Sequence, residues 1–341
     1  MSRYLVTGGA GFVGSMTVAR LLDQGDAVVV LDDLSLGHRD AVMPGARLVQ
    51  GDVGDRDLLD GVLSEGPWDG VLHFASLSLV GESMREPMRY LLRNGVCGLT
   101  LIDSCIRHGV RRFVLSSTAA LFGAGDGGPI GEAAVVEPAS PYGESKQVLE
   151  RALLWADRIH GLRSACLRYF NAAGADPAGR LGEDHDPETH LIPLAIDSAL
   201  GRRPPLALFG TDYPTPDGTC IRDYIHVADL ADAHVRALGM LDGRSVTYNL
   251  GTGTGHSVRE VAAAVGRVSG RRVPVVEQPR RAGDPPSLVA APNRLRAETG
   301  WTPRHASLDA IVGDAFRWRL RHPDGYGDKG RGSTVDIAAS A

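Results

Sequence analysis

Tyr142 and Lys146 are the residues of this chain whose types and spacing point most directly to chemistry. Both lie in the run Ser-Pro-Tyr-Gly-Glu-Ser-Lys at residues 140–146, where a loop gives way to a stretch rich in helix formers. Residues four apart on a helix share one face, so the phenol and the ammonium group stand one turn apart. A phenol has a pKa near ~10 and is a poor base at neutral pH, but nearby positive charge favours the phenolate. The pair therefore predicts a general base, although such pairs also occur by chance on solvated helix faces.

A glycine-rich turn near the N-terminus predicts a phosphate-binding site. Gly8, Gly11 and Gly14 have the spacing G-x-x-G-x-x-G and stand between an apolar strand at residues 4–6 and an apolar helical pattern that starts at Val13. Such a turn lets the backbone approach a pyrophosphate, and the helix start offers free N–H groups and the positive end of its dipole. The glycine pattern alone is weak, but the strand before it and the helix after it are the required context. We therefore expect dinucleotide contacts from the whole turn: Gly8, Gly11, Phe12, Val13 and Gly14.

Acidic residues follow the next two predicted strands. Asp32 and Asp33 end the second strand, about 20 residues past the glycines. A carboxylate there would accept hydrogen bonds from an adenosine ribose diol and repel a 2′-phosphate, which favours NAD over NADP. Capping of a loop is the alternative role for Asp32. After the third strand, at residues 47–50, Asp52 and its neighbour Val53 are expected beside the adenine, although N-capping the following helix is nearly as good an explanation of Asp52.

Strands and helices alternate through the first half of the chain. Further strands are predicted at residues 68–75 and 112–115, with a long helical stretch at 87–108 between them and the helix that carries Tyr142 after them. This alternation predicts a parallel sheet with right-handed crossovers and ligands at the carboxyl ends of its strands. His73 is expected to point into the core. The candidate residues fall at or just beyond such strand ends, which predicts a dinucleotide-binding enzyme domain of the α/β class with a Rossmann-type, doubly wound parallel sheet: Gly8, Asp32, Phe74, Thr118 and Tyr142.

The bulk composition narrows the class of protein. A chain of 341 residues with a net charge of −5 suits one large or two closely packed domains and argues against nucleic acid as the main partner. No apolar run approaches the ~18 residues of a membrane span, and no secretory signal is expected. The four cysteines lie far apart without a Cys-x-x-Cys pair, and the eleven histidines form no His-Glu-x-x-His pattern. We therefore expect no catalytic metal, no disulfide framework and a reducing cytoplasm as the compartment.

The chain resembles the extended short-chain dehydrogenase/reductases, and within them the UDP-glucose 4-epimerase family. The motifs that carry the resemblance are residues 7–14, Ser-Ser-Thr at 116–118, Tyr-x-x-x-Lys at 142–146, Arg-Tyr-Phe-Asn at 168–171 and Arg-Asp-Tyr-Ile-His-Val at 222–227. The likeness runs from about residue 4 to residue 326 and is especially close in the stretch before Arg222. It implies an enzyme that retains NAD, acts on a UDP-sugar and is commonly a homodimer.

The resemblance also implies a role for each matching residue. Tyr142 would take the proton from the sugar 4-hydroxyl while C4 passes its hydride to NAD, and Thr118 would hydrogen-bond the reacting oxygen. Lys146 would lower the pKa of Tyr142 and hold the nicotinamide ribose. Return of the hydride to the opposite face would interconvert UDP-glucose and UDP-galactose. Further cofactor contacts are implied at Phe74, Ala75, Ser76, Ser116, Tyr142, Lys146, Tyr169 and Phe170. The UDP-sugar is implied to lie against Thr118, Tyr142, Asn171, His190, Leu191, Ala207, Phe209, Arg222, Arg281, Asp284 and Leu288.

The second half of the chain is predicted to bind the substrate. Two guanidinium groups, those of Arg222 and Arg281, suit a diphosphate, although a surface salt bridge is the alternative for either arginine alone. We expect an NAD-binding Rossmann domain at residues 1–168 and a smaller UDP-sugar-binding α/β domain at residues 169–327, with parts of the chain returning to the first domain. The small and polar residues 328–341 are expected to be a disordered tail.

Several positions depart from the family pattern. Ser78 stands where many relatives carry a cofactor-facing Lys and Gly95 where they carry an Asn, so the tightness of NAD retention stays open. Leu288 matches a position that resembles a gate on the C2 side of the sugar, and its intermediate size predicts that N-acetylated UDP-sugars are also accepted. Thr118 is followed by two alanines rather than an acidic pair, which argues against sugar dehydration. A net oxidoreductase and a non-catalytic NAD-sensing regulator are further alternatives, the second disfavoured because the Tyr–Lys pair is intact.

Overall fold

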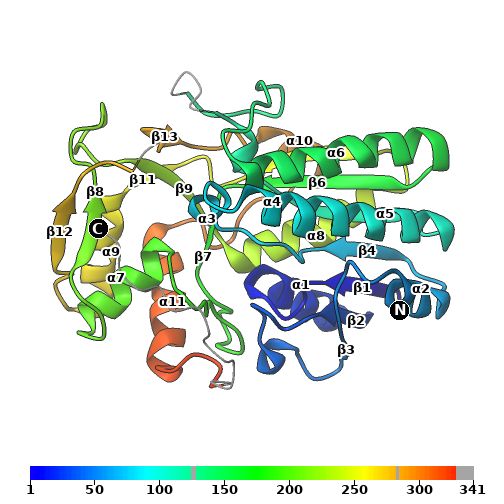
Figure 1. Ribbon diagram of the computed structural model, residues 1–341. Helices are drawn as coiled ribbons and strands as arrows, with labels where there is room; N and C mark the ends of the chain where they lie inside the picture. The colour runs from blue at the N-terminus through cyan, green and yellow to red at the C-terminus, as the bar shows by residue number, and fades with distance from the viewer. Residues whose placement is uncertain (124–127, 282–283, 328–341) are drawn as a thin grey trace.

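The computed structural model describes residues 1–123, 128–281 and 284–327, which form a large parallel sheet covered by helices and a smaller second lobe (Figure 1). The large sheet has seven parallel strands in the order β10-β6-β5-β4-β1-β2-β3. These are β1 (Arg3–Thr7), β2 (Ala27–Asp32), β3 (Arg47–Gln50), β4 (Gly70–His73), β5 (Arg112–Thr118), β6 (Arg163–Tyr169) and β10 (Val246–Leu250). The chain runs outward from β1 in one direction and then from β4 in the other, so a crevice opens between these strands at their carboxyl ends. The predicted Rossmann-type fold is confirmed.

Apolar strands and amphipathic helices explain this layering. Strand β2 reads Ala-Val-Val-Val-Leu-Asp and buries its residues on both faces, as a strand between two helical layers requires. One core lies between the sheet and helices α1 (Phe12–Asp23) and α8 (Val227–Met240). The other core lies against α2 (Arg56–Ser64), α5 (Cys97–Arg107) and α6 (Pro141–His160). The sheet is thereby shielded on both faces, which leaves its carboxyl edge as the place for ligands.

The second lobe is built from short strands and three helices. Strands β7 (Asn171–Ala173), β9 (Ile221–His226), β11 (Gly255–Ser257) and β13 (Ser287–Leu288) form one sheet, and β8 (Leu206–Phe209) pairs with β12 (Val275–Gln278). Helices α7 (Leu191–Ala199), α9 (Val258–Ser269) and α11 (Leu308–Arg321) share a third apolar core with these strands. The remaining short segments are η1 (Arg39–Ala41), α3 (Val80–Ser83), α4 (Pro87–Tyr90), η2 (Leu91–Val96), η3 (Ala119–Leu121) and α10 (Asn293–Thr299).

The two halves of the sequence are interwoven in the large sheet. Strand β10 belongs to the second half of the chain, yet it pairs with β6 along its whole length, and α8 packs against α1. The second half of the chain therefore contributes a strand and a helix to the layers of the large sheet. The proposed domain boundaries at residues 168 and 327 stay predictions, and the predicted disordered tail at residues 328–341 lies outside the described residues.

Two expected elements differ in detail from the structure. The strand expected at residues 68–75 is the shorter β4, because the backbone N–H groups of Phe74 and Ala75 both donate to the carbonyl of Thr7 and turn the chain over the end of β1. The helical stretch expected at residues 87–108 ends at Arg107 and contains a π-helical segment, η2. Within it, Asn94 is buried and its amide is bonded to the backbone of Leu77, a contact that accompanies the local widening of the helix.

Candidate active site

The glycine turn between β1 and α1 is a position where side chains do not fit. Gly8 has a φ of 73°, and a Cβ there would lie 2.3 Å from the backbone nitrogen of Ala75. A Cβ on Gly14 would lie 2.1 Å from the carbonyl oxygen of Gly8. Helix α1 begins behind Gly11, and no side chain caps its first N–H groups. Close packing of the turn, an uncapped helix start and the positive end of the helix dipole suit a pyrophosphate.

Asp32 lies at the end of β2 beside this turn and is only 7% exposed. Its two carboxylate oxygens accept hydrogen bonds from the backbone N–H groups of Ala10 and Leu34, at 2.9 Å each. Asp32 therefore holds the loop after β2, the role considered as the alternative, and it also lines the cavity described below. Each carboxylate oxygen accepts more than one hydrogen bond, so loop fixation and contact with a ribose are compatible.

Arg93 joins two of the predicted cofactor residues, a contact that the sequence does not predict. Its guanidinium lies 3.1 Å from Asp33 and 2.5 Å from Asp52. Burial acts to raise the pKa of Asp52, but the Gly54 N–H and Arg93 outweigh it and lower that pKa. The predicted alternative that Asp52 caps the next helix is wrong, because Asp55 is the N-cap of α2 and accepts from Leu58. Asp52 instead faces the same cavity as Arg93.

One cavity of about 590 Å³ extends along the carboxyl edge of the sheet and reaches the second lobe. Among the expected cofactor residues, sixteen line it: Gly8, Gly11, Phe12, Val13, Gly14, Asp32, Asp33, Asp52, Val53, Phe74, Ala75, Ser76, Ser116, Tyr142, Tyr169 and Phe170. Lys146 does not appear at the surface of the cavity, since its side chain is fully buried and donates to Ser76 at 3.1 Å. The residues that the sequence predicts to bind the cofactor therefore line one cavity, although they come from the glycine turn, from the ends of five strands and from the start of α6.

Two of the expected catalytic residues, Thr118 and Tyr142, line this cavity, and Lys146 is buried one helical turn after Tyr142. Helix α6 starts with Pro141 at its first position, and Ser140 caps it by accepting from Gly143, so Tyr142 sits in the first turn. Burial and the neighbouring Tyr169 raise the pKa of Tyr142 far above its usual value, while the Thr118 hydroxyl acts in the opposite direction. Burial lowers the pKa of Lys146 to about 7. Burial therefore opposes the charged form of each group, and positive charge near Tyr142 favours its phenolate.

Buried polar contacts fix the strands behind these residues. The hydroxyls of Ser116 and Tyr169 lie 2.6 Å apart and join β5 to β6. Glu150, on α6, accepts from the Ser117 hydroxyl at 2.6 Å and from the guanidinium of Arg168 at 2.6–3.2 Å. The side chains of Glu150 and Arg168 are each about 90% buried, so removal of either one would leave the charge of the other buried without a partner. These contacts hold α6 against the ends of β5 and β6, where the candidate catalytic groups are carried.

The substrate residues expected from the sequence divide into two groups. Seven line the cavity: Thr118, Tyr142, Asn171, His190, Arg222, Asp284 and Leu288. Arg222 donates to Asp284 at 2.9 Å and to the carbonyls of Ile221 and Pro285, which holds its side chain at the cavity wall. Four others are absent from the cavity lining: Leu191, Ala207, Phe209 and Arg281. The guanidinium of Arg281 lies 4.0 Å above the ring of Phe209, so these two residues interact with each other in this structure.

A loop before α7 contributes cavity residues that the sequence analysis did not identify. Asp184 and His185 line the cavity next to His190, and His185 stands edge-on to Phe12 with ring centroids 6.3 Å apart. The motif Glu-x-His-x-x-Glu-x-His at residues 183–190 is the available sequence signal for this cluster. Within residues 1–123, 128–281 and 284–327, no helix is long and apolar enough to cross a membrane.

Comparisons with known proteins agree with this site. Residues 4–251 match the NAD dependent epimerase/dehydratase family. A UDP-glucose 4-epimerase of Azospirillum brasilense is 51% identical over 330 residues, which cover 96% of this chain and 95% of the relative. A crystal structure of a UDP-glucose 4-epimerase is 45% identical, with a TM-score of 0.93 over 95% of this chain and 99% of that one. The enzyme of Brucella ovis, solved in complex with NAD, is 45% identical, with a TM-score of 0.90 over 93% of this chain and 98% of that one.

The family match covers residues 4–251, and this part of the chain contains the glycine turn, the acidic strand ends and the Tyr–Lys pair. Identity with the Azospirillum and Brucella enzymes extends through the second lobe as well. This chain belongs to the NAD-dependent epimerase/dehydratase family.

Proposed function

We propose that the protein is an isomerase that interconverts UDP-glucose and UDP-galactose with bound NAD. The observation that carries the proposal is that one cavity is lined by the glycine turn, by Tyr142 and Thr118, and by the Arg222–Asp284 pair. The glycine turn suits a dinucleotide, the guanidinium of Arg222 suits a nucleotide diphosphate, and Tyr142 can accept a proton. UDP-glucose 4-epimerases with nearly full-length similarity support this choice of substrate.

The residues of this chain handle the proton and orient the sugar. Tyr142 takes the proton of the sugar 4-hydroxyl, and the Thr118 hydroxyl hydrogen-bonds the same oxygen. Lys146, which donates to Ser76, would hold the cofactor ribose and contribute positive charge. NAD, when bound, supplies reversible hydride acceptance and a positively charged ring. Arg222 holds the nucleotide end while the oxidised sugar turns, so that either face of C4 can be presented.

The buried environment of Tyr142 and Lys146 opposes the charged form of each group. Burial raises the pKa of Tyr142 and lowers the pKa of Lys146 to about 7. Forming the phenolate near pH 7 from an ordinary phenol requires about 4 kcal/mol. Positive charge beside Tyr142, from Lys146 and from the nicotinamide ring of NAD, would favour the phenolate. The Asp32 carboxylate at the ribose end favours NAD over NADP.

Product analysis of purified protein tests this function. Given UDP-galactose without added cofactor, the wild type should form UDP-glucose with no net NADH, and Tyr142→Phe should be at least about 100-fold slower, within the range for loss of a general base. Tyr248→Phe is the matched control, because it removes a buried phenol that is bonded to Glu298 outside the cavity. Net NADH formation would instead establish the oxidoreductase, and no product even with NAD added would favour a regulator.

We propose that the size of Leu288 determines which substituents at C2 of the sugar the site accepts. Leu288 ends β13, lines the cavity and packs beside Phe122 and Phe170. A leucine leaves more room than a tyrosine and adds no hydroxyl, so UDP-GlcNAc and UDP-GalNAc should also be interconverted. Leu288→Tyr should reduce turnover of UDP-GalNAc while it preserves turnover of UDP-galactose. Equal turnover of UDP-GalNAc by the wild type and the variant would contradict this gate.

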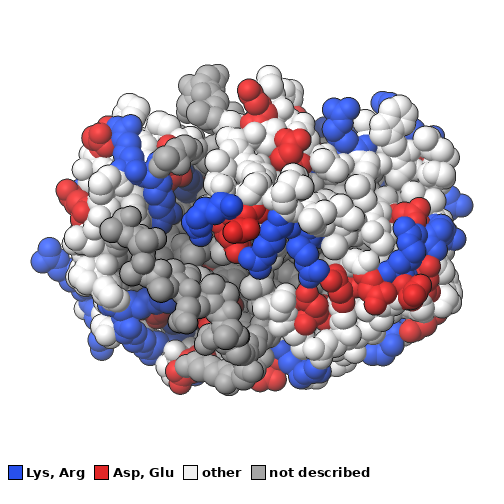
Figure 2. All heavy atoms as spheres, viewed as in Figure 1, with Lys and Arg blue, Asp and Glu red and all other residues white. Residues whose placement is uncertain are grey.

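We propose that the protein is a homodimer formed through α4, η2, α5 and α6. Apolar side chains on this face are 38–66% exposed, and Figure 2, viewed as Figure 1, shows the area over these helices as mostly uncharged. An exposed apolar face of this extent is typical of an interface. Light scattering should therefore give twice the chain mass, and Leu92→Glu should give monomers, whereas Leu320→Glu on α11 should not change the mass. Met84 lies directly after α3, and the other residues of this face lie on the four named elements: Met88, Leu92, Val96, Leu99, Leu154, Trp155 and Ile159.

We also propose the cytoplasm as the compartment and sugar-nucleotide metabolism as the context. All four cysteines are free thiols, which suits a reducing environment. Addition of an oxidant should not raise thermal stability; a stabilising disulfide in the purified protein would contradict this compartment.

A further inference from the structure

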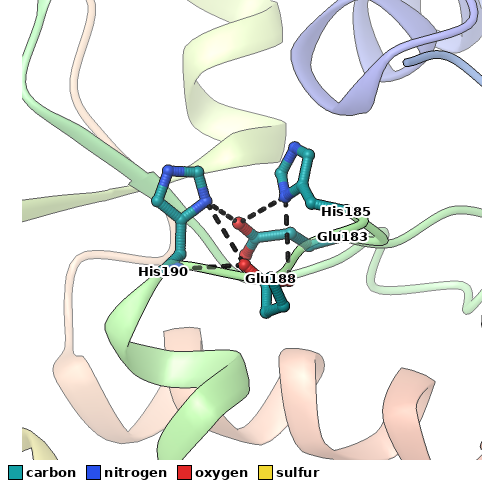
Figure 3. A group of neighbouring side chains, drawn as sticks. All are labelled: Glu183, His185, Glu188 and His190. Carbon is teal, nitrogen blue, oxygen red and sulfur yellow. Dashed lines mark hydrogen bonds and ion pairs between the residues drawn. The ribbon is translucent and has the colours of Figure 1, made fainter. Parts of the chain in front are cut away.

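Four side chains converge in the loop that precedes α7. Glu183, His185, Glu188 and His190 point toward one another, as Figure 3 shows, and each offers one ligand atom within 4.8 Å of the other three. Both carboxylates are almost completely buried, at 4% and 5% exposure. The Nδ1 atom of His190 lies 2.5 Å from Glu183, and the Nδ1 atom of His185 lies 3.5 Å from the same carboxylate. Two imidazoles and two carboxylates are thus concentrated in one small volume.

The cluster contains polar atoms whose hydrogen bonding is incomplete. Oε2 of Glu188 and Nδ1 of His185 are buried without a hydrogen-bond partner and lie 3.7 Å apart, too far for a hydrogen bond. The other oxygen of Glu188 accepts from the backbone N–H groups of Thr189 and His190, at 2.8 and 2.9 Å. These two bonds fix the carboxylate so that its other oxygen, Oε2, faces His185 at ion-pair distance without a hydrogen bond. A buried polar atom of this kind costs free energy unless another group binds it.

We propose that Glu183, His185, Glu188 and His190 bind one divalent transition-metal ion of the Zn²⁺ class. Ligand atoms at about 2.0–2.1 Å from a tetrahedral ion stand roughly 3.3 Å apart. Nδ1 of His185 lies 3.5 Å from Oε1 of Glu183 and 3.7 Å from Oε2 of Glu188, and both separations are near this value. Nδ1 of His190 lies 3.8 Å from the other oxygen of Glu188, Oε1, and its separation of 2.5 Å from Glu183 must open. Movement of the His190 side chain is therefore needed to admit the ion.

The ligand types select among metal ions. Imidazole nitrogen with carboxylate oxygen suits Zn²⁺ and its neighbours in the first transition row, whereas Mg²⁺ and Ca²⁺ prefer oxygen alone. Four protein ligands fill a tetrahedral ion, which leaves no position for water or substrate and makes the site structural. The site is therefore distinct from the reaction at Tyr142.

The position of the cluster indicates what the ion would stabilise. His185 and His190 line the cavity, and His185 touches Phe12 at the start of α1. Asp184, between two of the ligands, accepts from the backbone N–H of Tyr326 and lies 3.9 Å from Arg319 on α11. An ion bound here would fasten the loop between the dinucleotide-binding half and the second lobe, beside the cavity.

Metal titration of the NAD-loaded full chain tests the site. After treatment with a chelator, the protein should bind one Zn²⁺ per chain in competition with a chromophoric chelator, and Co²⁺ should give the intense visible bands of a tetrahedral complex. Glu188→Gln should weaken Zn²⁺ binding by at least about tenfold. The matched control is His305→Gln in the second His/Asp group, where His226 already donates to Asp314 at 3.1 Å, and it should leave the affinity unchanged.

Folding and function are measured separately from the metal. NAD content and circular dichroism of each variant show whether the fold is intact, and epimerase activity is assayed with and without Zn²⁺. Absence of stoichiometric Zn²⁺ and Co²⁺ binding in the wild type would overturn the proposal, and so would equal affinity in a folded Glu188→Gln variant. Either result would identify the cluster as an ion-pair network that locks the loop without a metal.

Discussion

Replacing Gly14 by alanine should damage the cofactor site through a single methyl group. The added Cβ would lie 2.1 Å from the carbonyl oxygen of Gly8 and 3.0 Å from the Cα of Gly9. Both contacts are backbone atoms, so no side chain can rotate away. Helix α1 must then move from the turn by about 1 Å to reach an ordinary separation, and this turn is the proposed pyrophosphate site.

The expected magnitude follows from two opposing contributions. Overpacking of a closely packed position costs about 1–3 kcal/mol. Alanine stabilises a helix interior by about 1 kcal/mol relative to glycine, and this stabilisation offsets part of that cost. The free energy of unfolding should therefore fall by up to about 2 kcal/mol. NAD retention should fall by at least about tenfold, since a 1 Å displacement takes an N–H group out of hydrogen-bonding range of a phosphate oxygen.

Gly61→Ala is the matched control for this substitution. Gly61 is a helical glycine in α2, it is exposed, and an added Cβ meets no atom within 4 Å. This variant should be more stable than the wild type by up to about 1 kcal/mol and should retain its NAD. Urea unfolding and the NAD released from heat-denatured protein measure both quantities. If Gly14→Ala keeps wild-type stability and NAD content, the steric argument for the turn is refuted.

Three further predictions concern the cofactor end and the buried histidines. Asp32→Asn should weaken NAD binding and reduce the preference for NAD over NADP, because the ribose diol loses a charged hydrogen-bond acceptor. Calorimetric titration with both dinucleotides measures the two affinities, and an unchanged ratio of NAD affinity to NADP affinity would contradict this prediction. Arg93→Ala should free the two carboxylates that Arg93 pairs at the adenosine end and so increase NAD loss on gel filtration, whereas Arg236→Ala on the α8 surface should not. Burial lowers the pKa of His73 to about 3 and the pKa of His234 to about 4, and the charge of Lys146 adds to the effect at His73. Below pH 6.5 the unfolded state therefore binds protons at these two histidines that the native state does not bind. Stability should fall from pH 6 to 5 by up to about 1.4 kcal/mol for each histidine, measured by urea titration, and His234→Leu should remove its share of that slope.

The sequence predicted those parts of the fold and site that depend on local pattern. The glycine turn, the Asp at the end of β2 and the Tyr–Lys pair on α6 each lie within one strand–turn–helix unit, so residue spacing sufficed to place them. Parallel strands then bring their carboxyl ends to one edge, which accounts for the shared cavity. His73, expected in the core, is 2% exposed and is bonded to Thr7.

Contacts between distant segments could not be predicted in the same way. Arg93 pairs with Asp33 across 60 positions of the chain, and no periodic pattern connects the two. The Glu183 cluster forms in a loop without regular periodicity. Arg281 was expected at the substrate diphosphate, but its side chain lies over Phe209 and outside the cavity lining. The direction of a long surface side chain depends on its neighbours in space, which the sequence does not give.

Strand β10 is translated long after β6, the strand with which it pairs, and this order affects folding on the ribosome. Strand β6 ends at Tyr169, while the strand that covers its outer edge begins only at Val246. The intervening segment of about 80 residues takes roughly 4 to 16 seconds to translate at typical rates. During that interval the nascent sheet ends in an unpaired, largely apolar strand, the kind of edge on which chains aggregate. Chaperone demand should therefore peak before residue 250 leaves the ribosome, and ribosome profiling of chaperone-bound nascent chains would locate that peak.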